Sequence, residues 1–219
     1  METKHNRTML GLTSIVCLLP IVIALILYDE LPEQIAIQWN HKGNPSNIAP
    51  KAFVAFGMPF FFMILNIFSK LRLYNDPKRD NIATAMKVLY TWLIPCLALV
   101  MIPISLFRAT GANIPIEVIG PVITGIILIV VGNYLPKNRL NYAVGIRLPW
   151  TLHDSDNWNK THRISGYLHI LSGIILILAS FLFYKNAAWL VIFFVVLVLT
   201  TVIPFLYSYV LYKKTGNKP

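Results

Sequence analysis

Six long apolar stretches, separated by polar segments, dominate the pattern of the chain. They cover approximately residues 8–28, 52–71, 83–107, 114–135, 164–184 and 187–209. A membrane-spanning helix requires about 20 mostly apolar residues. The stretches are apolar in continuous blocks and lack the spacing of a single helical face, which favours lipid as their surroundings. The pattern therefore predicts an all-α integral membrane bundle of six transmembrane helices, forming one domain over residues 1–219.

Glycine spacing in the fourth stretch indicates how it packs. Gly125 and Gly132 lie seven residues apart, two helical turns, and so share one face of the helix. Small residues on a membrane helix let another backbone approach closely. We expect a neighbouring helix to pack against this face.

The polar segment after the first apolar stretch predicts a small ordered cap. The apolar residues Ile35, Ile37 and Trp39 alternate with polar ones, which are Gln34, Gln38 and Asn40. This alternation is typical of a short strand with one apolar face. Gly43, Asn44 and Pro45 then predict a turn. Because bundle connections usually have about 2–8 residues, this segment is too long to be a simple connector.

The second informative polar segment covers residues 132–167. Asp154 or Ser155 can cap a helix that continues into the fifth apolar stretch. On that helix Trp158, His162 and Ser165 are three or four residues apart and share one face. The segment is expected to be amphipathic and to lie against the membrane surface.

Aromatic and basic residues of the same segment suggest contact with lipid headgroups. Trp150 and Trp158 are of the type that anchors chains at the interface, and Arg147 and Arg163 are able to bind phosphate. Together with Asn133, Gly145, Pro149 and His162, these four residues form the candidate inner site.

Composition supports a membrane location. Of 219 residues, 56% are hydrophobic and 13% are charged, whereas soluble domains contain about 25% charged residues. The net charge of +10 does not favour nucleic acid, because basic residues of membrane proteins set topology and contact anionic lipids. We therefore expect membrane lipids as partners, with no direct nucleic-acid binding.

The distribution of basic residues predicts the orientation. All Lys and Arg residues except Lys42, Lys51, Arg108 and Lys185 lie in segments on one side of the predicted bundle. Cytoplasmic loops carry the excess of positive charge. Both termini and residues 132–167 are therefore predicted to be cytoplasmic, and the cap after the first span is predicted to be extracellular, on the cell membrane.

The extracellular cap contains the candidate ligand-binding residues. These are Glu30, Pro32, Glu33, Trp39 and Gly43. The carboxylates of this segment, which include Asp29, either attract a cationic partner or simply reflect the exclusion of positive charge from the outside. A packed loop with Trp39 at the headgroup level is an equally good interpretation.

Both polar segments resemble motifs of the SdpI-type family. The stretch LPEQIAIQWNHKGNPSNIAPK, within residues 1–71, resembles its outer motif, LP-x-x-I-P-x-H-W-x-x-x-G. The stretch GNYLPKNRLNYAVGIRLPWTLHDSDNWNKTHRISGY, residues 132–167, is similar to its inner signature. Ala36, Gln38 and Leu148 depart from the residues common in the family. Gln38 replaces a histidine, which weakens any proposal of metal binding there.

The resemblance implies a bacterial multi-pass immunity protein that gives resistance to a secreted, membrane-active peptide toxin or bacteriocin. One distinctive segment on each face adds the hypothesis that the protein binds the toxin and signals to a cytoplasmic transcriptional regulator.

Two other classes of function are weighed against immunity. The middles of the spans contain no Asp, Glu, Lys or Arg, which argues against an ion-coupled transporter, because such residues mark ion pathways. A small-solute facilitator or transporter remains the alternative. Neither a His-Glu-x-x-His nor a Gly-x-Ser-x-Gly motif occurs. A zinc site at His162 and His169 would need a third ligand, for which Asp154 and Asp156 are only candidates. We therefore predict no catalytic site, metal or cofactor.

Overall fold

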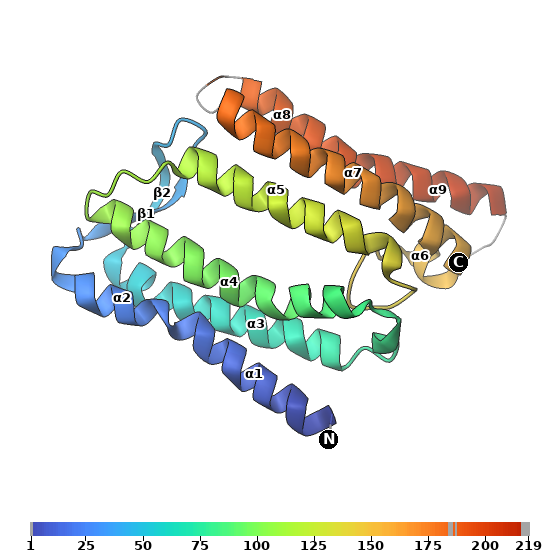
Figure 1. Ribbon diagram of the computed structural model, residues 1–219, viewed down its shortest axis with the longest axis horizontal. Helices are drawn as coiled ribbons and strands as arrows, with labels where there is room; N and C mark the ends of the chain where they lie inside the picture. The colour runs from blue at the N-terminus through green and yellow to red at the C-terminus, as the bar shows by residue number, and fades with distance from the viewer. Residues whose placement is uncertain (1, 184–185, 187, 216–219) are drawn as a thin grey trace. The chain divides into compact units, whose positions relative to one another are not determined.

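The computed structural model describes residues 2–183, 186 and 188–215, with side chains from residue 6 onward. The predicted ends at Tyr184 and Ala187, and the basic residues Lys185 and Lys218, lie outside these residues. The helices and strands, drawn in Figure 1, are α1 Glu2–Leu18, α2 Pro20–Leu27, β1 Gln34–Trp39, β2 Pro45–Pro50, α3 Met58–Tyr74, α4 Thr84–Ala109, α5 Ile116–Tyr134, α6 Pro149–His153, α7 Ser155–Leu182, α8 Ala188–Leu197 and α9 Ile203–Thr215.

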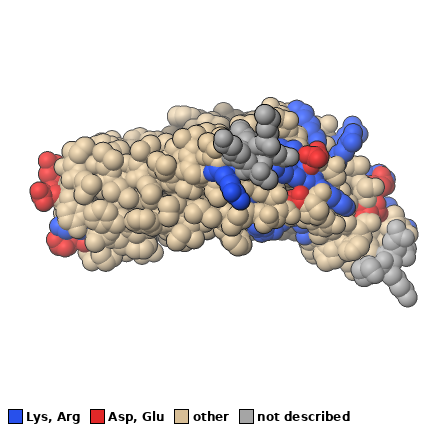
Figure 2. All heavy atoms as spheres, turned by 90° about the horizontal axis from the view of Figure 1, so that it is seen from below, with Lys and Arg blue, Asp and Glu red and all other residues tan. Residues whose placement is uncertain are grey.

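Six helical stretches in the described part of the chain are long and apolar enough to cross a membrane, which confirms the predicted number. They are Asn6–Glu30, Phe53–Tyr74, Thr84–Ala109, Ile116–Lys137, Ser155–Leu182 and Ala188–Thr215. The fifth helix begins at Ser155, well before the apolar stretch that starts near residue 164. On the face drawn in Figure 2, a wide surface without charged side chains separates the charged groups, as expected of helices surrounded by lipid.

Proline residues coincide with three irregularities of these helices. The first span is divided at Leu19, just before Pro20. Short π-helical turns at Phe53–Gly57 and Val198–Val202 lie immediately before the helical turns that contain Pro59 and Pro204. A proline has no N–H to donate and disturbs the preceding turn, and π-helical turns are one way in which the helix absorbs that disturbance.

The chain forms two compact units. The first includes the residues up to Tyr74 together with Val88–Ile116, and the second includes Asn75–Lys87 and the residues from Glu117 onward. The prediction of a single domain over residues 1–219 stays a prediction.

The first unit has a largely apolar core with a polar cluster between α1 and α3. Cys17, Ala24 and Ile102 are fully buried in that core. Lys70 is one of the basic residues that were predicted to face the cytoplasm. It lies within α3 with its side chain buried, and its Nζ donates to the carbonyl of Met9 at 2.9 Å. Asn66 Nδ2 donates to Thr13 Oγ1 at 3.0 Å. Such hydrogen bonds stabilise the association of membrane helices, to which the hydrophobic effect contributes little in lipid.

A two-stranded antiparallel hairpin follows the first span, as Figure 1 shows. Ile35 on β1 is buried and lies opposite Ala49 on β2. The structure thus confirms the predicted strand with an apolar face and adds a second strand that the pattern did not indicate.

In the second unit, two pairs of glycines bring α5 and α7 into backbone contact. A Cβ atom on Gly125 would lie 2.7 Å from the carbonyl oxygen of Gly173, and one on Gly132 would lie 2.6 Å from that of Gly166. The expected close approach at Gly125 and Gly132 is confirmed, and the partner helix supplies its own glycines at the matching positions.

This packing predicts the effect of a single methyl group. Gly125→Ala places a Cβ against the Gly173 carbonyl, so the helices must separate, and we expect unfolding to become easier by about 1–3 kcal/mol. The measurement is the thermal unfolding of the purified protein in detergent. Gly120→Ala is the matched control on the same helix, because a Cβ there meets nothing within 4 Å. A G125A protein as stable as G120A would contradict the glycine contact.

Candidate functional site

The turn of the hairpin between β1 and β2, predicted to be extracellular, is organised by one side chain. Asn40 Oδ1 accepts hydrogen bonds from the backbone N–H groups of Lys42, at 2.9 Å, and Asn44, at 3.1 Å. Gly43 has a φ of 79°, in the left-handed region that glycine adopts without steric cost. The predicted turn at residues 43–45 therefore overlaps the connection between β1 and β2, which covers residues 40–44.

Arg108, in the last turn of α4, holds this turn against the end of that helix. Its Nη2 donates to the carbonyl of Gly43 at 3.0 Å and its Nη1 to that of Ile114 at 2.8 Å. The guanidinium carbon lies 5.4 Å from the centroid of the Trp39 ring, within the range of a cation–π contact. Two candidate ligand residues, Trp39 and Gly43, are thus engaged by Arg108. Sequence reasoning missed this role, although Arg108 stood out as one of few basic residues predicted outside.

The acidic residues of the cap differ in their surroundings. Glu33 Oε1 lies 2.9 Å from Lys51 Nζ, and this hydrogen bond raises the pKa of Lys51 above its ordinary value. The Glu33 side chain remains 85% exposed. Asp29, Glu30 and Pro32 are also exposed. Among the candidate residues, Glu30, Pro32 and Glu33 therefore present a surface that a partner can reach.

On the other polar segment, Asp76 holds the loop that precedes α6. Its Oδ2 accepts the backbone N–H groups of Tyr142, at 2.8 Å, and Ala143, at 2.7 Å, while Oδ1 accepts that of Lys78 at 2.8 Å. The Asp76 residue is only 7% exposed. A buried carboxylate with three N–H donors fixes the loop across a separation of 66 residues in sequence.

Two buried asparagines complete the support of this loop. Asn138 donates through Nδ2 to the Tyr134 carbonyl at 2.8 Å and accepts the Ala83 N–H at 3.0 Å. Asn141 Oδ1 accepts the N–H of Val144 at 2.7 Å. Asn138 therefore adds a side-chain donor to the carbonyl at the end of α5, and Asn141 closes a local turn.

Gly145, Trp158 and His162 meet in one buried contact. His162 Nε2 accepts the N–H of Ile146 at 3.0 Å, so the imidazole proton lies on Nδ1 and is donated to the Trp158 carbonyl at 2.8 Å. The rings of Trp158 and His162 stack with centroids 3.9 Å apart. Gly145 has a φ of 115°, and a Cβ there would collide with the imidazole. These three residues are tightly packed.

Burial confirms one prediction for α7 and corrects another. Trp158, His162 and Ser165 are all fully buried on one face, as their spacing predicts. The prediction that Trp158 anchors the chain at the membrane interface is wrong. Its indole lies inside the second unit, where Nε1 donates to the Asn138 carbonyl at 2.9 Å.

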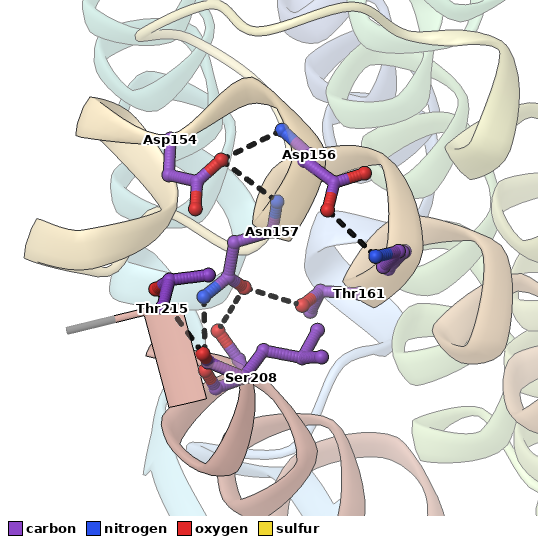
Figure 3. A network of polar contacts seen from close by, with 8 residues as sticks. Asp154, Asp156, Asn157, Thr161, Ser208 and Thr215 are labelled. Carbon is purple, nitrogen blue, oxygen red and sulfur yellow. Dashed lines mark hydrogen bonds and ion pairs between the residues drawn. The ribbon is translucent and has the colours of Figure 1, made fainter. Parts of the chain in front are cut away.

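A polar network, drawn in Figure 3, joins α7 to α9. Asp154 caps α7 by accepting the N–H groups of Asp156 and Asn157, as predicted. Asn157 Nδ2 donates to the Ser208 carbonyl at 3.0 Å, and its Oδ1 accepts the hydroxyls of Ser208, at 2.9 Å, and Thr161, at 3.0 Å. The Asn157 amide thus donates one hydrogen bond to α9, accepts one from α9 and accepts one from within α7.

Trp150 extends the network from α6. Its Nε1 donates to Ser208 Oγ at 2.7 Å, and its ring stacks on Tyr212 with centroids 5.5 Å apart. Thr151 Oγ1 accepts the N–H of Leu148 at 2.9 Å and donates to the carbonyl of Ile146 at 2.8 Å. The half-buried Trp150 therefore attaches α6 to α9.

The remaining candidate residues lie in different places. Arg147 is exposed, and its Nη1 donates to the Tyr142 carbonyl at 2.7 Å. Pro149 is the first residue of α6. Asn133 and Arg163 line a groove between α5 and α7. The residues of the candidate inner site therefore do not form one site. Some lie in a packed contact, others in an exposed loop and others in a groove.

The arrangement suits binding and positioning. Within the described residues, no group of three His, Cys, Asp or Glu side chains is placed to hold a metal ion. Nδ1 of His162 and Nδ1 of His169 each lie 2.8 Å from a carbonyl oxygen of the preceding helical turn.

The role of Asp76 is testable by hydrogen exchange. Asp76→Ala leaves the amide of Tyr142 without its carboxylate acceptor and leaves that of Ala143 with Asn141 Oδ1 at 3.1 Å. Hydrogen bonds to charged groups contribute about 1.5–3 kcal/mol each. We expect faster deuterium uptake at residues 141–147 and a lower melting temperature. Asp80→Ala is the control, because the Asp80 side chain is fully exposed, 3.8 Å from Lys87. Unchanged uptake in D76A would show that the loop is held by other contacts.

Comparisons with known proteins cover both polar segments. Residues 137–208 match a model of the SdpI/YfhL protein family, and residues 15–63 match a domain of unknown function (DUF1648). The chain is 32% identical over 205 residues to Immunity protein SdpI of Bacillus subtilis (strain 168), an alignment that covers 93% of this chain and 95% of that protein. No solved structure matches the chain. The chain is a multi-pass membrane protein and belongs to the SdpI/YfhL family.

Proposed function

We propose that this protein is an immunity protein that protects the cell carrying it from a secreted, membrane-active peptide toxin. The observation that carries the proposal is the 32% identity to Immunity protein SdpI, which extends over 93% of the chain. The similarity includes all six spans and both polar segments.

The toxin is proposed to contact the outer hairpin. The hairpin is ordered by Asn40 and Arg108, so its exposed residues keep fixed positions. Asp29 and Glu30 present negative charge there, and Ile48, 56% exposed on β2, adds an apolar side chain. A cationic amphipathic peptide complements such a surface, because opposite charges steer the encounter and apolar contact stabilises the complex.

The inner loop is proposed to transmit the bound state to a cytoplasmic regulator. It combines an ordered backbone, held by Asp76, with exposed side chains that include Arg147 and Tyr142. Ordered loops with exposed polar and aromatic residues are common binding surfaces.

The test is expression in a toxin-sensitive bacterium that is then challenged with candidate cationic secreted peptides. The full chain is expected to raise the peptide concentration needed for growth arrest. Asp29→Asn with Glu30→Gln should lower that protection by about 2- to 30-fold, because exposed charge contacts contribute about 0.2–1 kcal/mol each. Asp80→Asn with Asp156→Asn is the charge-matched control on the other polar segments, and it should protect fully.

Three outcomes of this challenge are decisive. Equal protection by both double variants, at equal membrane levels, would contradict toxin contact through the acidic cap. Arg147→Gln tests the inner loop, and full protection by R147Q would contradict signalling through that residue. If the purified protein allowed solute flux into proteoliposomes and the expressed chain gave no protection, the proposal of immunity would be wrong and a facilitator would be favoured.

The proposed orientation, with both termini in the cytoplasm, has a direct test. In a variant with Cys17→Ser and Cys96→Ser, we introduce Asn44→Cys in the hairpin turn or Lys160→Cys in the exposed first turns of α7. A membrane-impermeant maleimide should label N44C on intact cells, and it should label K160C only after the cells are permeabilised. The reverse pattern would invert the topology.

A further inference from the structure

A groove of about 400 Å³ lies between the end of α5 and the first turns of α7, within the second unit. Gly132 and Gly166 line it, and their backbones touch. A Cβ on Gly166 would lie 2.6 Å from Pro136 Cγ, so the missing side chains are what allow the helices to meet. The groove is not explained by the packed contact of Gly145, Trp158 and His162, which faces elsewhere on α7.

The rim of the groove carries positive charge and amide groups. Lys137 and Arg163 are both exposed, one from each side, and Asn133 and Asn159 lie beside them. Lys137 Nζ lies 4.5 Å from the centroid of the Tyr134 ring. Among the residues that the structure describes, no carboxylate lines the groove. Two cations with neighbouring amide donors fit a phosphate group, which arginine contacts through paired N–H donors.

The groove changes from polar to apolar along α7. Arg163, Tyr167 and Ile170 follow one another along the wall that α7 contributes, toward the apolar part of the helix. At about 1.5 Å per residue, Ile170 lies roughly 10 Å beyond Arg163 along the helix axis. Tyr167, 63% exposed, presents an amphipathic ring between them. Along α7 a charged group is thus followed by an aromatic ring and then by an aliphatic side chain. This order matches that of the headgroup, glycerol region and acyl chain of a phospholipid.

We infer that this groove binds an anionic phospholipid, with its phosphate between Lys137 and Arg163 and its acyl region along Tyr167 and Ile170. A soluble phosphate shares the chemistry of the headgroup, but it has no apolar part that would contact the wall formed by Tyr167 and Ile170. Nonspecific attraction to a basic surface would not require the hollow that the glycines leave. The inference is independent of the proposed immunity function.

The test is native mass spectrometry of the full-length protein in detergent micelles. The protein is titrated with phosphatidylglycerol and, separately, with phosphatidylcholine that carries the same acyl chains. We expect phosphatidylglycerol to bind at least about 10-fold more tightly, because two basic groups contribute about 1 kcal/mol each. The double variant Lys137→Gln with Arg163→Gln should bind both lipids equally.

The matched control is Arg139→Gln with Lys160→Gln. It removes the same charge from the same two segments but leaves the groove intact, and it should retain the preference for phosphatidylglycerol. Equal losses in both double variants, or no preference in the wild type, would overturn the site. Displacement of phosphatidylglycerol by inorganic phosphate alone would contradict the assignment of a lipid ligand and would indicate a binding site for soluble anions. Should the groove double variant not purify, K137Q and R163Q are measured singly, and an undiminished preference in both would equally contradict the site.

Discussion

Peptide groups outside helices need hydrogen-bond partners where a chain turns at the edge of a membrane, and this constraint governs both polar segments. At the inner loop, Asp76 accepts three backbone N–H groups, and Asn138 and Asn141 provide for the residues around them. At the hairpin, Asn40 and Arg108 do the same for N–H and carbonyl groups respectively. Polar side chains thus replace water as the partner of irregular backbone.

Helix association in the second unit follows from the same surroundings. In lipid the hydrophobic effect does not stabilise the association of apolar helices. Close backbone packing and hydrogen bonds between helices must therefore stabilise it. The glycine pairs supply the first between α5 and α7, and the Asn157 amide supplies the second between α7 and α9. Because α7 takes part in both contacts, and also carries Trp158 and His162 under the inner loop, it organises the unit.

Local signals explain which features could be predicted from sequence. The six spans follow from length and hydropathy, the start of α7 from the cap at Asp154, and the hairpin turn from Gly43. Strand β2 has prolines at both ends and exposed residues along most of its length, so it exists through pairing with β1 and carries no pattern of its own. Asp76 and Arg108 reach partners 66 and 65 residues away, and a single sequence contains no trace of such contacts.

The structure also changes which motif residues are informative about function. Trp39, Gly43, Gly145, Trp158 and His162 were selected because their types and spacing are distinctive, yet each is engaged in packing or in holding a turn. Their replacement would alter the loops that present other residues, so a loss of function would not separate folding from contact with a partner. Glu30, Arg147 and Arg163 are exposed, and changing them leaves the supporting hydrogen bonds of Asn40 and Asp76 in place. The distinctive motif residues therefore account for the shape of the two surfaces, and the exposed residues beside them are the ones whose replacement tests the proposed binding.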